Sequence, residues 1–176
     1  GITQSVLFYG FPSIAIADAD RHAIDVLDAA LSGAALPGGR LHAKLRDNEL
    51  VYVVHAYNSP GIDGGMFVVY AATTPQNRAK ARTIIEEEIE RMRAEPISEA
   101  ELERAKSMMI SARAIDLQTN SSQARDAASN ELFGLGYADG ATYAEKINAI
   151  TREDVQRVAA KYLEKERAAL AIVEPK

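Results

Sequence analysis

The sequence of 176 residues contains no cysteine. This absence excludes a disulfide framework, a thiol nucleophile and a thiolate metal site. It does not identify the cellular compartment. Any metal site or covalent chemistry in this chain would have to use other side chains.

Long apolar runs and an excess of basic charge are also missing. No run approaches the roughly 18 residues that a membrane span requires. The first twenty residues have no basic segment before their apolar part and are predicted to form a strand, so they are not typical of a signal peptide. A net charge of -5 and a pI near 5.3 disfavour binding to nucleic acid or an anionic membrane. We therefore expect a soluble protein, cytoplasmic or periplasmic.

What the chain does have is an ordinary globular composition, with 47% hydrophobic and 26% charged residues. A chain of this length can bury about two-thirds of its unfolded surface without a metal or disulfide. We expect residues 1–176 to form a single domain. Because the chain opens directly on a predicted strand behind Gly1, we also expect it to be a piece of a longer protein, with any targeting segment upstream of Gly1.

Four segments have the composition of strands, and two of them flank the glycine-rich stretch NSPGIDGG, which predicts a hairpin. The first ends at Pro12. The predicted strands are residues 4–11, 51–57, 66–73 and 168–173.

Helices are predicted from apolar residues at spacings of three and four and from capping residues. Asp18 or Asp20 begins the first helix, which ends at Gly33 and buries Ile24, Leu27 and Leu31. A short helix bearing Leu41 and Leu45 is predicted next, followed by one that is capped by Thr74 with Pro75 and buries Ala81, Ile84, Ile85, Ile89 and Met92. A Ser98/Glu101 capping box begins a long helix that bears Leu102, Ala105, Met109 and Ala112. The last three predicted helices are residues 121–133, residues 143–149 and residues 155–163, the last of them capped by Thr151. The order favours an α+β fold, a two-layer sandwich with helices packed on one face of a mixed or antiparallel sheet.

Few residues carry a recognisable chemistry. His22, His42 and His55 lie in three different elements, without HExxH or HxxEH spacing. We interpret them as packed or solvated histidines and keep a zinc site built from them as a lesser possibility. Met108 and Met109 are typical of core residues. The carboxylates of residues 86, 87, 88 and 90 are predicted to form a solvated helix face.

Arg46 and Tyr52 stand on either side of a predicted tight helix-to-strand turn. A guanidinium and a phenol hydroxyl placed this way could converge on one substrate oxygen. The residues alone leave a structural alternative open, because an arginine at a helix end complements the helix dipole and a tyrosine in a strand usually packs.

The order of short motifs along the whole chain resembles that of a known family. The motifs are Arg40-Leu41, Leu45-Arg46 and Leu50-Val51-Tyr52, with Gln4 in the first strand, Asp63-Gly64-Gly65 before Met66-Phe67, Thr74-Pro75, Ile97-Ser98 with Glu101-Leu102 and Ala105-Lys106, and Ile150 to Val155. This pattern is similar to the second domain of the insulinase-like (pitrilysin) zinc metallopeptidases. The segment between Arg46 and Tyr52 is one residue shorter than the commonest family spacing, and Gly38-Gly39 replaces a serine-rich turn.

The resemblance implies a fold of the mitochondrial-processing-peptidase type and a C-terminal domain that binds no zinc. It implies a partner domain or subunit that carries HxxEH and the zinc ion, an extended peptide substrate, and no cofactor or catalytic residue in this chain alone. Arg46 and Tyr52 would contact the peptide near the scissile bond. An alternative is a non-proteolytic assembly subunit that resembles the core proteins of respiratory complexes.

Overall fold

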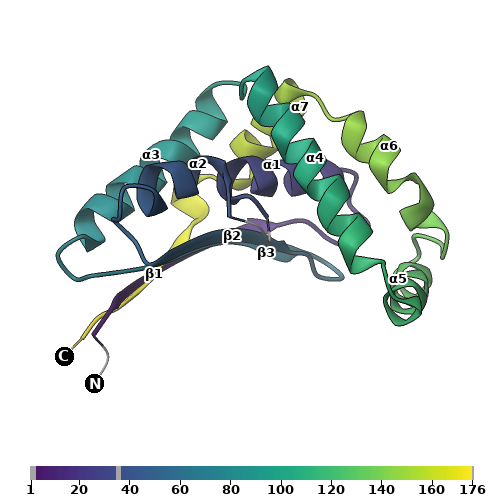
Figure 1. The fold of residues 1–176 in the computed structure, drawn as a ribbon, viewed down its shortest axis with the longest axis horizontal. Coiled ribbons are helices and arrows are strands. Elements are labelled where there is room, and N and C mark those ends of the chain that lie inside the picture. Colours follow the sequence, from purple (N-terminus) through teal and green to yellow (C-terminus); the bar gives the residue numbers. More distant parts are fainter. Residues whose placement is uncertain (1–2, 35–36, 176) are drawn as a thin grey trace.

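The computed structural model of the chain describes residues 3–34 and 37–175 and has two layers, with helices packed on one face of a sheet (Figure 1). The strands are β1 (Ser5–Ser13), β2 (Val53–Ser59), β3 (Gly65–Thr73) and β4 (Ala169–Val173). They are hydrogen-bonded in the order β2-β3-β1-β4, and each neighbouring pair is antiparallel. The predicted α+β sandwich is confirmed, and the sheet of the described residues is antiparallel throughout.

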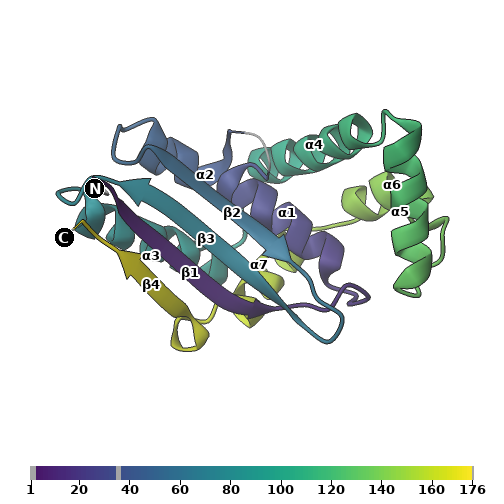
Figure 2. The ribbon, with the colours of Figure 1, turned by 90° about the horizontal axis from the view of Figure 1, so that it is seen from below.

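Seen from below, the sheet lies in front of the helices (Figure 2). The predicted hairpin is present as the antiparallel pair β2 and β3. Strand β1 is longer than predicted, because it continues through Pro12 to Ser13. Its pairing with β4 covers only Val6 to Gly10, so one edge of β1 is free at Pro12 and tolerates a residue without an N–H.

The helical layer follows the predicted order. It consists of α1 (Arg21–Ser32), α2 (Gly39–Leu41), the π-helical turn η1 (His42–Arg46), α3 (Arg78–Ala94), α4 (Glu99–Asp116), α5 (Asn120–Leu132), the 3-10 turn η2 (Asp139–Thr142), α6 (Tyr143–Asn148), α7 (Arg152–Tyr162) and the 3-10 turn η3 (Lys165–Arg167). Two of the predicted caps are confirmed as capping boxes, Ser98 with Glu101 and Thr151 with Asp154. Gly33 ends α1 in the left-handed conformation.

The predicted start of α3 was wrong. Thr74 Oγ1 accepts a hydrogen bond from the Asn77 backbone N–H at 3.2 Å, and the Asn77 N–H also lies 3.2 Å from the Thr74 carbonyl. Residues 74–77 therefore form a separate turn, and the helix begins only at Arg78. A threonine that bonds its own backbone neighbourhood makes such a turn as readily as a helix cap.

Asp20 stands at the N-cap position of α1, as predicted, but its carboxylate does not cap the helix. Its oxygens accept hydrogen bonds from Arg157 (2.7 Å), Lys161 (2.8 Å) and Tyr162 (2.9 Å) of α7. Burial alone would raise the pKa of Asp20, but these three donors lower it to about 2. The carboxylate therefore ties α1 to α7.

The core lies between the helices and the upper face of the sheet. The predicted stripe of Ile24, Leu27 and Leu31 on α1 is buried. On α3, residues Ala81, Ile85, Ile89 and Met92 are buried as predicted and Ile84 is partly buried. From the sheet, every second residue points into this core, including Leu7, Tyr9, Phe11, Val54, Ala56, Phe67, Val69 and Ala71.

The second half of α4 and the whole of α5 extend beyond the sheet (Figures 1 and 2). On α4, Leu102 and Ala105 are buried, whereas Met109 is only partly buried and packs against the edge of the core. Helix α5 has no buried residue. None of the helices in residues 3–34 and 37–175 combines the length and apolar character needed to cross a membrane.

Asp28 on α1 is a buried acid, with 9% of its surface exposed. The Ser32 hydroxyl lies 3.2 Å from Asp28 Oδ1 and accepts the Ala56 N–H at 2.7 Å. Burial, together with the negative charge of Asp25, raises the pKa of Asp28 to about 7, although the Ser32 hydrogen bond acts in the opposite direction. Between about pH 4 and pH 7, the Asp28 carboxyl group therefore holds a proton in the folded protein that it has already released in the unfolded chain.

From this follows a pH prediction. Because the folded-state pKa of Asp28 is raised, its contribution to stability falls as the pH rises from about 4 to about 7. Asp28→Asn should remove that loss, so its free energy of unfolding relative to wild type should improve by about 2 to 4 kcal/mol between pH 4 and pH 8. Urea denaturation at both pH values measures it. The exposed Asp63→Asn serves as control, and equal pH profiles of wild type and Asp28→Asn would contradict the prediction.

Candidate functional site

The turn between η1 and β2 positions both predicted site residues. Buried Leu45 at one end and Val51 at the other anchor it in the core. Asn48 Nδ2 donates to the carbonyls of Ala43 (3.0 Å) and Lys44 (3.2 Å), and so satisfies the end of the helical turn. The predicted helix-to-strand turn is therefore a defined structure held from both sides.

Arg46 is the last residue of η1 and its side chain is exposed. Its Nη1 donates to the Val51 carbonyl at 3.3 Å, across the turn. This single long hydrogen bond leaves most of the guanidinium donors available. The contact also brings Arg46 against the backbone of the residue that precedes Tyr52.

Tyr52 lies just before β2, and half of its surface is exposed (50%). Its backbone N–H donates to the Ala72 carbonyl at 2.8 Å, so the edge of the sheet fixes its position. Within the described part of the chain, the hydroxyl of Tyr52 makes no hydrogen bond. The structure thus places Arg46 and Tyr52 at one turn, each with free donors, and joins them through Val51 rather than by a direct hydrogen bond.

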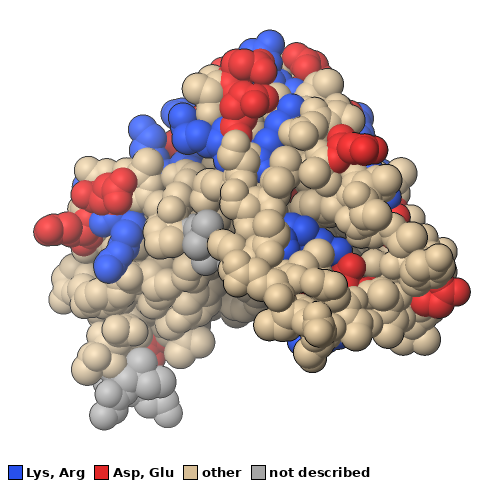
Figure 3. Space-filling view, turned by 45° about the vertical axis from the view of Figure 1, so that its right-hand side comes forward, with Lys and Arg blue, Asp and Glu red and all other residues tan. Residues whose placement is uncertain are grey.

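The lower face of the sheet is apolar and aromatic. The residues that alternate with the core residues point to this face, and they are Val6 and Phe8 of β1, Val53, His55 and Tyr57 of β2, and Met66, Val68 and Tyr70 of β3. Tyr57 and Met66 are each exposed by more than 40%. Acidic and basic side chains are interspersed over the helical upper part, whereas the lower part is mostly uncharged in the view of Figure 3.

The three histidines do not come together. The rings of His42 and His55 lie 5.7 Å apart, whereas His22 packs edge-on against Tyr143 with its ring 5.6 Å away. Burial, with the nearby charge of Arg21, lowers the pKa of His22 to about 4. In residues 3–34 and 37–175, no three His, Asp or Glu side chains are arranged to hold a metal ion.

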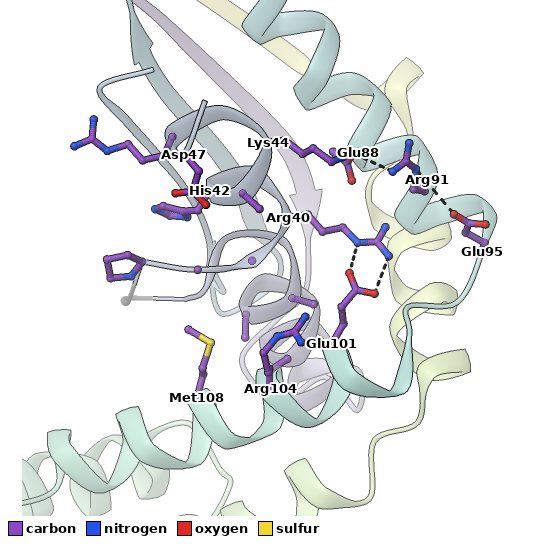
Figure 4. Close-up of a pocket in the computed structure, with 18 residues that line it drawn as sticks. Arg40, His42, Lys44, Asp47, Glu88, Arg91, Glu95, Glu101, Arg104 and Met108 are labelled. Carbon is purple, nitrogen blue, oxygen red and sulfur yellow. Dashed lines mark hydrogen bonds and ion pairs between the residues drawn. The ribbon is translucent and has the colours of Figure 1, made fainter. Parts of the chain in front are cut away.

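A pocket with many charged residues in its walls lies on the helical side, next to Arg46 (Figure 4). Its volume is about 710 Å³, and its walls come from α1, the segment of α2 and η1, the end of α3 and the beginning of α4. Arg46 lines this pocket, whereas Tyr52 is not among its lining residues. Five arginine and lysine side chains and four carboxylates line it, together with His42.

One sequence prediction about this region was wrong. Glu87 and Glu90 of α3 are exposed as predicted, but Glu88 is buried, with only 3% of its surface exposed. The α2 and η1 segment packs against α3. Arg40 pairs with Glu101 at 2.6 Å, although the two are 61 residues apart in the chain. In the sequence, Arg40 and Glu101 belonged to two separate motifs, and the pattern did not predict that they would pair.

Comparison with known proteins adds to this geometry. Residues 1–109 match the family described as the peptidase M16 inactive domain. The chain is 26% identical over 173 residues to an uncharacterized zinc protease of Streptomyces coelicolor, covering 98% of the chain and 37% of that protein. The chain therefore spans well under half the length of the curated relative it matches.

Among solved structures, the fold is similar to the peptidase M16 inactive domain from Pseudomonas fluorescens, with a TM-score of 0.89 and 18% identity, over 99% of this chain and 42% of that one. It is also similar to a chain of complex III2 from Candida albicans, with a TM-score of 0.83 and 18% identity, over 98% of this chain and 43% of that one. At these identities the likeness is one of fold.

Proposed function

The chain belongs to the family of peptidase M16 inactive domains, because the match covers residues 1–109 of 176, and from this premise we propose that it is the non-zinc-binding partner domain of a zinc metallopeptidase. The resemblance to the insulinase-like peptidases is confirmed by this match. In our proposal, the chain closes over an extended peptide and assists its hydrolysis by a domain or subunit that bears HxxEH.

The observation that carries this proposal is the family match to an inactive domain together with the coverage of the relative. A chain that aligns over 98% of its own length accounts for only 37% of a protein named as a zinc protease. The remaining length of that relative is sufficient for a second domain of this size. We propose that the corresponding partner of this chain lies in the same polypeptide, upstream, or in a separate subunit.

The residues that the structure describes do not fit a zinc site. The donors required would be three or four His, Asp or Glu side chains around one point, and the described residues offer no such group. The zinc ion is therefore assigned to the partner, where it would activate the attacking water. The contribution of this chain is to hold the peptide and to place hydrogen-bond donors.

Arg46 and Tyr52 are the donors that we propose for this role. Both reach solvent from one rigid turn, and neither is saturated by contacts within the described residues. A guanidinium and a phenol can donate to a peptide carbonyl or to the oxyanion that develops there. Although the interval between the two residues is one shorter than the commonest family spacing, the Arg46 contact to Val51 keeps the guanidinium at the turn.

The apolar lower face of the sheet supports the same arrangement. Exposed apolar groups on a sheet face, such as Tyr57 and Met66, mark surfaces that another protein segment covers. We propose that this face looks toward the partner and the bound peptide when the two halves close.

A second candidate is a non-proteolytic assembly subunit. The likeness to a chain of complex III2 from Candida albicans, with a TM-score of 0.83, favours it as an alternative because the same fold occurs there. This alternative requires partner binding but no contribution to peptide hydrolysis.

Reconstitution separates the two. We expect that an HxxEH-bearing partner hydrolyses a fluorogenic peptide at least about a hundredfold faster, in kcat/KM, when this chain is present, since the partner alone lacks the donors across the cleft. The measurement is initial rate as a function of the concentration of this chain, with a zinc-loaded partner.

The negative control is a partner in which the HxxEH glutamate is replaced by glutamine. A complex that forms, as seen by analytical ultracentrifugation, but leaves kcat/KM unchanged would favour the assembly subunit. No complex with any HxxEH-bearing protein from the same genome would contradict the role as a partner domain of a peptidase.

A further inference from the structure

Two Asp-Gly pairs occur in the sequence, Asp63-Gly64 and Asp139-Gly140. In such a pair, the backbone nitrogen of the glycine can attack the side-chain carboxyl carbon of the aspartate, because glycine has no Cβ that hinders the approach. The structure places the two pairs in different surroundings. One lies in an open loop, and the other lies in a turn that ion pairs hold.

Asp63-Gly64 lies in the loop between β2 and β3, which extends from the end of the sheet (Figure 2). Both residues are exposed. In the described part of the chain, the Asp63 carboxylate has no hydrogen bond or ion pair, and the Gly64 N–H has no acceptor. A Cβ built on Gly64 would meet only the Ser13 carbonyl oxygen, at 3.8 Å. The Asp63 carboxyl group is therefore free to rotate toward the Gly64 nitrogen.

Asp139-Gly140 is enclosed. Asp139 begins the turn η2, and its carboxylate accepts hydrogen bonds from Arg21 of α1 and from Lys146 of α6, the latter at 2.7 Å. Only 18% of its side chain is exposed. A Cβ built on Gly140 would lie 2.5 Å from Arg113 Nη2. Rotation of this carboxyl group toward the next nitrogen would break two charge-assisted hydrogen bonds.

Charge separates the two pairs further. An amide nitrogen attacks the neutral carboxyl group, because a carboxylate repels a nucleophile and has no hydroxyl that can leave as water. Burial opposes the charge of Asp139, but the hydrogen bonds from Lys146 and Arg21 lower the pKa of its carboxyl group. The neutral form that reacts is therefore scarce at Asp139.

We propose that Asp63 is a site of spontaneous modification, at which aspartate converts to isoaspartate through a cyclic imide, whereas Asp139 is protected by its ion pairs. The conversion is a property of this chain alone, so it does not depend on a peptidase partner. It requires no oxidant and no metal ion.

The atoms balance in two steps. The Gly64 nitrogen forms a bond to Cγ of Asp63 and loses its proton, and the carboxyl hydroxyl leaves with that proton as water. A water molecule then adds to one carbonyl of the ring and breaks its bond to nitrogen. Opening at the backbone carbonyl of Asp63 gives isoaspartate, in which the main chain runs through the former side chain. Opening at Cγ restores aspartate.

The product lengthens the main chain of the loop by one carbon atom, and the base of the loop is tightly packed. The Ile16 N–H donates to the Gly61 carbonyl at 2.9 Å, and a Cβ built on Gly65 would lie 2.5 Å from the Ser59 carbonyl oxygen. We therefore expect faster hydrogen exchange of the Ile16 amide in the modified chain. Tyr52 lies at the other end of β2, away from this loop.

The test is prolonged incubation of the folded 176-residue chain at neutral pH. A parallel sample, unfolded in guanidinium chloride, sets the duration, because both samples are stopped when the unfolded chain contains measurable isoaspartate at both pairs. After digestion, chromatography with mass spectrometry separates the isoaspartyl peptides from the aspartyl peptides of equal mass. In the folded chain, we expect at least about tenfold more isoaspartate at residue 63 than at residue 139, because the hydrogen bonds of Asp139 have to break first. In the unfolded chain, both pairs should convert to a similar extent.

Two variants separate the surroundings from the local sequence. Ile62→Ala makes the tripeptide around Asp63 identical to Ala138-Asp139-Gly140, and Ile62 is 78% exposed, so the fold should be kept. The difference between the two pairs should persist in this variant. Asp63→Glu should stop conversion in the loop, because the longer side chain would have to close a larger ring. Thermal melting checks that both variants fold.

Two outcomes would overturn the proposal. The first is a folded chain without isoaspartate at residue 63, which would mean that the loop holds the carboxyl group away from the Gly64 nitrogen. The second is an equal amount at residues 63 and 139 in folded Ile62→Ala, which would mean that the ion pairs of Asp139 do not protect it.

Discussion

Tyr52→Phe is expected to lower kcat of the assembled peptidase by about a hundredfold and to change KM little. In our proposal, the hydroxyl donates to the oxyanion that forms only as water attacks, so its loss weakens the transition state more than the bound substrate. Removal of one such donor typically costs a factor of about one hundred to one thousand in kcat. Steady-state kinetics with a fluorogenic peptide and the HxxEH-bearing partner measure it.

Tyr52→Phe should remove the hydroxyl group without disturbing other contacts in the structure. The Tyr52 hydroxyl has no hydrogen-bond partner in the described residues, and the backbone bond from Tyr52 N–H to Ala72 is kept by phenylalanine. Stability should therefore remain unchanged. Tyr137→Phe is the matched control, because Tyr137 is 71% exposed and follows α5, outside both the turn and the sheet. An unchanged kcat for Tyr52→Phe would remove Tyr52 from the assisting role.

Gly39→Ala is expected to lower the free energy of unfolding by about 3 kcal/mol or more. Gly39 has a φ of +72°, a region in which a side chain costs about 1 to 2 kcal/mol. A Cβ there would also lie 2.6 Å from the carbonyl carbon of Leu31 and from the nitrogen of Ser32. Both are backbone atoms at the end of α1, which cannot move aside without displacing a buried helix.

Gly134→Ala is the matched control for this prediction. Gly134 has a similar φ of +76°, but no atom lies within 4 Å of the added Cβ. We expect about 1 to 2 kcal/mol from the backbone alone. Urea denaturation of both variants measures the difference, which isolates the close approach of α2 to α1. Equal losses would mean that this contact can relax.

The close approach at Gly39 also positions the segment that follows it. It sets where α2 begins, and thereby the position of Arg40 in the pocket and of the η1 turn that presents Arg46. A glycine pair could be predicted to form a turn from the sequence. That Gly39 must be glycine follows from the packing of α1 against it, which the local sequence does not contain.

The elements that were predicted well depend on neighbours in the chain. Gly33 ends α1, Ser98 with Glu101 begins α4, and the apolar stripe of α3 is buried, because caps and helical periods are set by residues within about four positions. The start of α3 was missed for a related reason, since Thr74 had two local structures available and formed the turn.

For the candidate site, the sequence predicted where Arg46 and Tyr52 lie but not their surroundings. Arg46 and Tyr52 do lie on either side of a turn, as predicted. The hydrogen bond of Arg46 to Val51 and the pocket beside it were not predicted. The burial of Glu88 was missed although it lies three residues after Ile85 and four before Met92, on the buried stripe of α3. The prediction followed the charge of the side chain, because glutamate is rarely buried, rather than its position on the helix.

By itself, therefore, the sequence determined the order of the elements, the α+β class and the resemblance to an inactive peptidase domain, because these depend on local patterns and short motifs. Only the tertiary structure decided which charges meet. Asp20 binds Arg157 across 137 positions of the chain, and Arg40 binds Glu101 across 61. The physical reason is that burial and ion pairing arise when distant segments pack. That packing buries one polar atom each of Arg40 and Glu88 without a hydrogen-bond partner among the described residues.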